Sequence, residues 1–180
     1  MKQPKSVKLG SFTVVSGTLR ISDPCYDLDT WCAGDVENCK KGQWNSHVKV
    51  YDEGKWGNRV GVLIACHQDY PYDSIADGYW VKEKIDVGVD SGQGGIFDKE
   101  FFKKDEVVKG VKRTYKGEAI CIDEPWYSIC CDKTLGKKRG GVIPFGCVSS
   151  SGYGDGSYIC RTYKHRGKIV GVMIDYGLAS

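Results

Sequence analysis

Short runs in which apolar and polar residues alternate recur along this chain, and β-branched residues are frequent in them. Such runs are typical of half-buried strands rather than of long helices. The pattern therefore predicts strands at residues 7–15, 17–22, 47–52, 58–66, 80–90, 142–149, 157–163 and 168–175. We expect a mainly β fold, α+β at most, built as an antiparallel β-sheet sandwich or an open barrel with one or two short helices.

The last two runs predict a β-hairpin that turns at residues 165–167, where a glycine allows the tight turn. Helical signals are fewer. Asp98 is placed to cap a short turn that ends at Phe102, and an acidic pair followed by Pro125 is typical of the start of a helix, here running to Leu135.

The chain has 180 residues, of which 41% are hydrophobic and 27% charged, so it is long enough to form one hydrophobic core. No repeat or long linker divides it, and we expect a single β-rich domain over residues 1–180. Residues 105–116 are the most polar segment, which suggests a basic, mobile insertion around residues 99–139. No apolar run is long enough to cross a bilayer, and the first residues lack the apolar stretch of a secretory signal. We therefore expect a soluble, non-exported protein.

The formal net charge of +3 is unevenly distributed. Residues 1–90 carry 11 basic and 13 acidic side chains, whereas residues 91–180 carry 15 and 10. A basic half is suited to an anionic partner, although solvated surface charge is the alternative. The residues expected to contact an acidic protein surface or nucleic acid are Lys103, Lys104, Lys112, Arg113, Lys137, Lys138 and Arg139.

Nine cysteines are present, an odd number, and no export signal accompanies them, which argues against a disulfide framework. No CxxC pair and no calcium-binding loop occurs, so we expect neither a metal nor another cofactor. Cysteine often packs as a small apolar residue. Cys66, Cys121, Cys147 and Cys160 lie inside apolar runs, and we expect them to be buried.

Three glycine-rich stretches, residues 16–26, 90–98 and 149–158, combine acidic, hydroxyl and aromatic side chains. If the strands bring them together, they form a polar ligand pocket, while turn stabilisation by Asp and Ser is the structural alternative. The candidate ligand-binding residues are Asp23, Cys25, Asp90, Ser91, Gln93, Asp98, Ser150, Tyr153 and Asp155. None of the three stretches completes a phosphate-binding or dinucleotide-binding motif.

No catalytic residue is assigned from the sequence. A nucleophilic Ser or Cys needs a histidine beside it, and the chain has only three histidines. His67 directly follows Cys66, so on a strand their side chains point to opposite faces. The aromatic residues are expected mainly to fill the core, except in residues 69–73, where Tyr and Asp alternate around a proline and indicate an exposed recognition loop.

Several of these motifs recur together in one group of proteins. The chain contains SGTLRISDPCYD, then WC, GQWN and WGNRV, then VGVDSGQGGIFD and finally VSSSGYGDGSY. In these segments it resembles small proteins encoded by bacteriophages and prophages of gut Firmicutes, over nearly its whole length and least over residues 99–139. The group has no established catalytic residues to carry over. The resemblance implies a phage accessory protein that acts in the host bacterial cytoplasm.

Three hypotheses follow from these observations. The first is a binding protein that inhibits a host defence component, most concretely an anti-CRISPR inhibitor of a nuclease. The second is a pocket protein that sequesters or cleaves a small nucleotide immune signal. The third is a virion or structural accessory protein. We expect a binding protein rather than an enzyme, because no complete catalytic signature is present.

Overall fold

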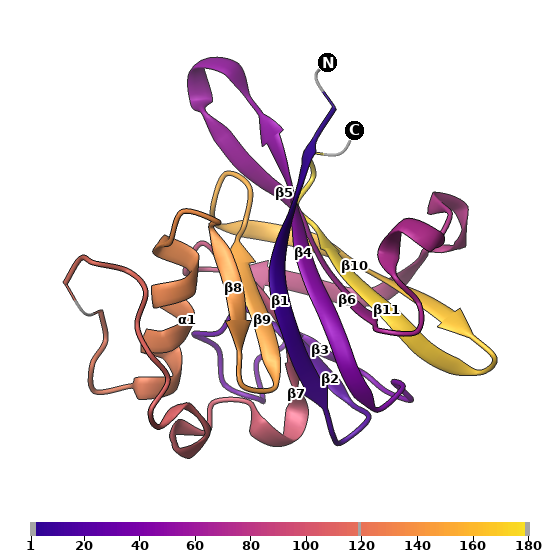
Figure 1. Ribbon diagram of the computed structural model, residues 1–180, viewed down its shortest axis with the longest axis horizontal. Helices are drawn as coiled ribbons and strands as arrows, with labels where there is room; N and C mark the ends of the chain where they lie inside the picture. The colour runs from indigo at the N-terminus through magenta and orange to yellow at the C-terminus, as the bar shows by residue number, and fades with distance from the viewer. Residues whose placement is uncertain (1–2, 119, 179–180) are drawn as a thin grey trace.

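Two antiparallel β-sheets make up most of the molecule in the computed structural model, which describes residues 3–118 and 120–178 (Figure 1). The six-stranded sheet has the order β1 (Lys5–Val14), β4 (Gly42–Asp52), β5 (Asn58–His67), β11 (Lys168–Asp175), β10 (Gly156–His165) and β6 (Val81–Val89). The five-stranded sheet has the order β3 (Gly34–Val36), β2 (Leu19–Ser22), β7 (Gln93–Asp98), β9 (Gly146–Ser150) and β8 (Gly140–Ile143). The sheets do not close into a barrel, and the predicted mainly β fold is confirmed.

The main core lies between the two sheets. Alternate residues of β4 point inward, so that Trp44 and Val48 are completely buried against residues of the other sheet, including Ile21 and Ile96. Alternation along a strand places every second side chain on the same face, which is why a period of two in the sequence marks this layer. The sheets therefore pack as a sandwich.

A helical layer covers the outer face of the five-stranded sheet (Figure 1). Helix α1 (Pro125–Leu135) begins at a proline, as predicted, and buries Trp126 against Phe97 and Phe102. Asp98 caps the short helix η4 (Lys99–Phe101), also as predicted, by accepting a hydrogen bond from the N–H of Glu100. The remaining short helices are η1 (Gly54–Trp56), η2 (Tyr72–Ser74), η3 (Asp77–Tyr79) and η5 (Asp105–Val108).

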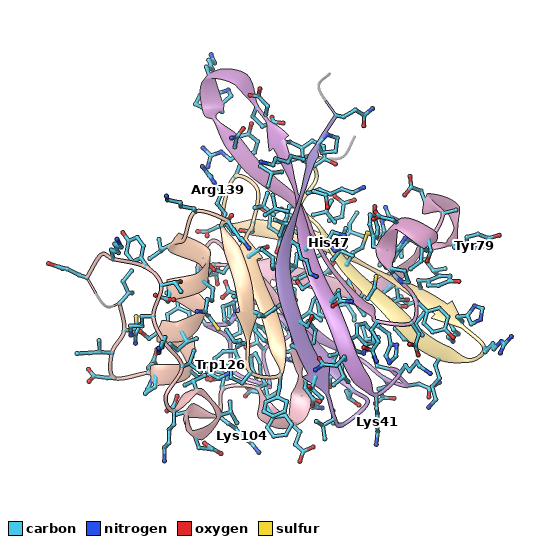
Figure 2. All side chains as sticks on the ribbon, viewed as in Figure 1. Lys41, His47, Tyr79, Lys104, Trp126 and Arg139 are labelled. Atoms are coloured by element: carbon cyan, nitrogen blue, oxygen red, sulfur yellow. The ribbon has the colours of Figure 1, made fainter. Side chains whose placement is uncertain are left out.

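A third apolar cluster covers the outer face of the six-stranded sheet. The segment between β5 and β6 folds back so that Trp80 packs over Ile64 and Met173. Tyr72 lies between this tryptophan and His47, with ring centroids 6.1 Å and 4.9 Å away. Figure 2 shows His47 on the sheet and Tyr79 on this covering segment. The predicted recognition loop is thus half-buried at both tyrosines, because their rings cover the sheet.

Three predictions about individual elements were wrong or incomplete. Residues 142–149 are not one strand but belong to β8 and β9, which are separated by Pro144 and by Phe145 with φ of 64°. A proline cannot donate to a ladder, and a positive φ turns the chain. Strands β3 and β7 were missed. All six residues of β7 are buried, so it has no polar–apolar alternation to detect.

The cysteine prediction holds in part. Cys66, Cys147 and Cys160 are buried, as expected, whereas Cys121 is exposed because it lies in the irregular segment before α1. All nine cysteines are free thiols. Within residues 3–118 and 120–178, no helix has the length and apolar character needed to cross a membrane.

Candidate functional site

Two of the three glycine-rich stretches meet beside Asp23, which follows β2 directly. The side chain of Asp23 is completely buried. Its Oδ2 accepts hydrogen bonds from the N–H groups of Asp90 and Ser91 at 2.9 and 2.7 Å. Its Oδ1 accepts from the Ser91 hydroxyl at 2.6 Å and from the Cys25 N–H at 2.8 Å. Four donors occupy the accepting capacity of a carboxylate, so Asp23 is fully engaged inside the protein.

The two turns that connect the sheets run next to each other at this end of the sandwich. The N–H of Ser151 donates to the carbonyl of Gly92 at 3.0 Å. Gly156 pairs with Val89, so the exposed Asp155 lies beside the strand end that leads into Asp90. Asp90 is itself exposed and accepts a hydrogen bond from the Tyr26 hydroxyl at 2.8 Å.

Residues of all three stretches meet here, but Asp98 does not join them, which corrects the expectation that it lines the same pocket. It lies at the opposite end of β7 from Gln93, because Leu19 pairs with Asp98 whereas Ser22 pairs with Gly95. There the buried carboxylate accepts hydrogen bonds from the N–H groups of Val15 and Ser16 at 2.6 and 2.9 Å.

The neighbours of Asp23 form an internal hydrogen-bonded network rather than an open site. Gln93 donates to the Cys131 sulfur at 3.4 Å and accepts from the Thr134 hydroxyl at 2.8 Å. Burial, together with hydrogen bonding to Asp23 and its charge, raises the pKa of Cys25 to about 12. Burial likewise raises the pKa of Cys131. Protonated thiols are poor nucleophiles at neutral pH, so this network is not arranged for cysteine catalysis.

The remaining candidates of the predicted pocket lie towards the surface. Ser150 pairs with Gln93 at the end of β9, and its N–H donates to the carbonyl of Arg139. Tyr153 is 54% exposed and donates to Glu53 at 2.8 Å, with the Arg59 guanidinium over its ring. Five cavities in the described part of the chain, of about 30–700 Å³, are lined by residues other than Asp23, Asp90 and Asp155.

The predicted basic residues do not form one surface. In Figure 2, Lys104 and Arg139 lie at opposite ends of the helical layer. Lys103 donates to the Cys25 carbonyl at 3.3 Å and to Asp27 at 3.1 Å, and Arg113 donates to the Ser128 carbonyl at 3.4 Å. Lys112 is exposed on the segment before α1.

Lys137 and Lys138 line a cleft of about 700 Å³ between β8, the end of α1 and the segment before α1. We call it the lysine cleft. Its lining residues are Leu9, Thr114, Tyr115, Lys116, Gly117, Lys133, Leu135, Gly136, Lys137, Lys138, Gly140, Gly141 and Val142. Arg139 lies next to it, in a smaller hollow of about 240 Å³ that shares Lys137 and Lys138.

Asp132 fixes one wall of the lysine cleft. Its buried carboxylate, on α1, accepts hydrogen bonds from the N–H groups of Thr114 and Tyr115 and from the Thr114 hydroxyl at 2.9–3.0 Å. Burial alone raises the pKa of Asp132, but these hydrogen bonds and the charge of Lys133 outweigh it and lower the pKa. The charged carboxylate thus holds the segment that carries Lys116 against α1.

Two of the four cleft lysines are also held in position. Lys133 Nζ donates to the Lys112 carbonyl at 3.3 Å and lies 3.4 Å from Asp132. Lys138 Nζ donates to the Lys8 carbonyl on β1 at 3.0 Å. None of the described residues that line the cleft is acidic. Like charges in a concave surface reinforce one another, so the cleft is electropositive.

The residues predicted to contact a partner do not include Lys116 or Lys133, and the apolar part of the cleft was not predicted. The position of Lys133 could have been recognised from the sequence, since it lies in the last turn of the predicted helix, where basic residues are favoured. Leu9 and Val142 carry no such signal, because their proximity to the lysines depends on how β1 and β8 pack. Among the described residues, no three His, Cys, Asp or Glu side chains gather as a metal site would require.

No protein-family model, curated protein or solved structure matches this chain. The resemblance to phage and prophage proteins therefore stays a prediction, and a function has to be inferred from the geometry of the site.

Proposed function

We propose that this protein is a binding protein that inhibits a host defence component in the bacterial cytoplasm, most concretely a CRISPR nuclease. The observation that carries the binding role is the lysine cleft, which gathers four lysines from two separate segments around one concavity without a lining acid. Its volume of about 700 Å³ lies in the range of ligand sites, roughly 300–1,000 Å³.

The polar side chains of the glycine-rich turns bond to one another inside the protein, which supports a binding protein over an enzyme. Asp23 and Ser91 hydrogen-bond to each other, and the thiol of Cys25 beside them is protonated. A general base or nucleophile needs access to its substrate, and Asp23 is completely buried. The hypothesis of a nucleotide pocket loses one of its carboxylates, Asp23, for the same reason.

A plasmid-interference assay tests the proposal in cells. Bacteria with an active CRISPR nuclease that targets a plasmid are transformed with that plasmid, with and without this protein. We expect the wild type to restore transformation. The variant K137E/K138E is expected to lose this effect, because it reverses two charges of the lysine cleft.

The matched control is K164E/R166E. These exposed residues lie at the β10–β11 turn, away from α1 and β8 (Figure 1), and the variant changes the net charge equally. We expect the control to inhibit like the wild type. Failure to restore transformation against any CRISPR nuclease tested, or equal inhibition by both double variants, contradicts the proposal. In vitro, inhibition should weaken as salt rises, since charge pairing is screened.

A further inference from the structure

The lysine cleft is lined by apolar side chains as well as by lysines, and we call these two sets of residues its floor and its rim. Leu9, Leu135, Val142 and the ring of Tyr115 line it, and Leu135 and Tyr115 remain 45% and 41% exposed. Covering apolar surface on binding is favourable. A ligand that fits the cleft therefore carries apolar groups beside its negative charges.

The ammonium groups of the rim can donate hydrogen bonds to the carboxylates of a ligand. An ammonium group has three donors. Lys138 uses one on a backbone carbonyl and retains two for a ligand, whereas Lys133 donates to a backbone carbonyl and also lies 3.4 Å from Asp132, so it has less capacity left. The ammonium groups of Lys116 and Lys137 form no ion pair with any residue in the described part of the chain. Prepositioned donors reduce the side-chain entropy that is lost on binding.

The outer edge of β8 borders the lysine cleft, with Val142 half-buried and Gly140 and Gly141 buried. β8 is the last strand of its sheet and pairs only with β9. The N–H of Ser150 donates to the Arg139 carbonyl, and hydrogen-bonded positions alternate along antiparallel strands. The backbone groups of Gly140 and Val142, which both line the cleft, therefore point away from β9. A peptide can add to such an edge as a further strand.

We propose that the lysine cleft binds a short, extended acidic segment of the partner protein, in which apolar and acidic side chains alternate. Alternation places the apolar side chains on one face, towards the floor, and the carboxylates on the other, within reach of the lysines at the rim. This inference rests on the proposed function in that it takes the partner to be a protein. Single-stranded nucleic acid fits less well, because it stacks on rows of aromatic rings and the floor is mostly aliphatic.

Fluorescence anisotropy with the full-length protein tests the inference. The probe is a labelled peptide of alternating Leu and Glu. A peptide with the same composition in separate Leu and Glu blocks and a labelled single-stranded DNA serve as comparisons. We expect the wild type to bind the alternating peptide more tightly than the two comparison probes. The affinity of K137E/K138E for this peptide should be at least about tenfold lower than that of the wild type, whereas K164E/R166E should bind it like the wild type.

A second pair of variants tests the floor. Leu135→Gln is expected to weaken binding of the alternating peptide about fivefold, because it removes apolar area at an exposed position. Leu28→Gln is the matched control, since Leu28 is 49% exposed and does not line the cleft. Equal binding of both peptides, tighter binding of the DNA, or equal effects of the two Leu variants would overturn the inference.

The two proposals fail separately. Loss of nuclease inhibition in K137E/K138E without preference for the alternating peptide overturns only the peptide inference. Preference for that peptide without inhibition of any nuclease overturns only the proposed function.

Discussion

The buried carboxylate of Asp23 accepts hydrogen bonds from both the N–H and the hydroxyl of Ser91, at 2.7 and 2.6 Å. These bonds attach the end of β2 to the turn by which the chain crosses from one sheet to the other. Asp98 repeats the arrangement at the opposite end, where it holds Val15 and Ser16. The two carboxylates therefore stabilise the connections between the sheets.

Asp23→Asn is expected to destabilise the protein by about 2–3 kcal/mol, because an amide cannot accept all four hydrogen bonds and its NH₂ group faces donors. Urea unfolding measures the change. Asp155→Asn, at an exposed position, should change the free energy of unfolding by less than about 0.5 kcal/mol. Equal stability of the two variants would show that the hydrogen bonds of Asp23 do not stabilise the connection between the sheets.

Stability should fall in acid in a way that depends on Asp132. Its pKa is lowered in the folded protein, so the unfolded chain binds the proton more readily. The stabilisation from its hydrogen bonds is present above about pH 4 and is lost as the pH falls through the folded-state pKa. Urea unfolding at several pH values should show that the free energy of unfolding falls less steeply in acid for Asp132→Asn than for the wild type. The exposed Asp123→Asn should keep the wild-type pH profile, and an unchanged profile in Asp132→Asn would refute this role.

Cysteine alkylation should discriminate strongly between two thiols. Cys25 has a pKa raised to about 12, so almost none of it is thiolate at neutral pH, and only part of its surface is accessible. Cys121 is the exposed cysteine. Brief treatment with iodoacetamide followed by mass spectrometry of peptides should show Cys121 modified first. Modification of Cys25 at the same rate would argue that its thiol is activated.

Gly140→Ala should destabilise the edge of the five-stranded sheet. A Cβ at this position would lie 2.7 Å from the carbonyl oxygen of Val148, which is backbone and cannot move aside without shifting β9. Such overpacking costs about 1–3 kcal/mol. Gly78→Ala is the control, because no atom lies within 4 Å of its added Cβ. Thermal unfolding of both variants measures the difference. Equal melting temperatures would show that a Cβ at Gly140 does not collide with the carbonyl oxygen of Val148.

Most of the strands could be predicted because their alternation reflects a single buried face. The hairpin of β10 and β11 turns at residues 165–167, as the glycine there indicated. β7 was not predicted because all of its residues are buried, and β3 has only three residues. Local patterns do not distinguish such strands from loops.

The candidate sites were predictable only in part. Aspartates and serines on glycine-rich turns marked places where polar groups matter, but their residue types do not tell whether the bonding partner is a ligand or the chain itself. The structure pairs Asp23 with Ser91 and separates Asp98 from both. Likewise, Lys103 and Lys138 look alike in sequence, yet only Lys138 lines the lysine cleft.

The order of apolar and polar residues was sufficient to predict a β-rich chain, and the acidic pair before Pro125 indicated where a helix starts, because strand periods and helix-start signals are local properties. Only the tertiary structure decided which charges lie together. The lysine cleft depends on β1, β8 and α1 meeting, and on Asp132 holding the segment at Thr114, contacts between residues far apart in sequence. Such contacts follow from the packing of the whole chain, which no local pattern records.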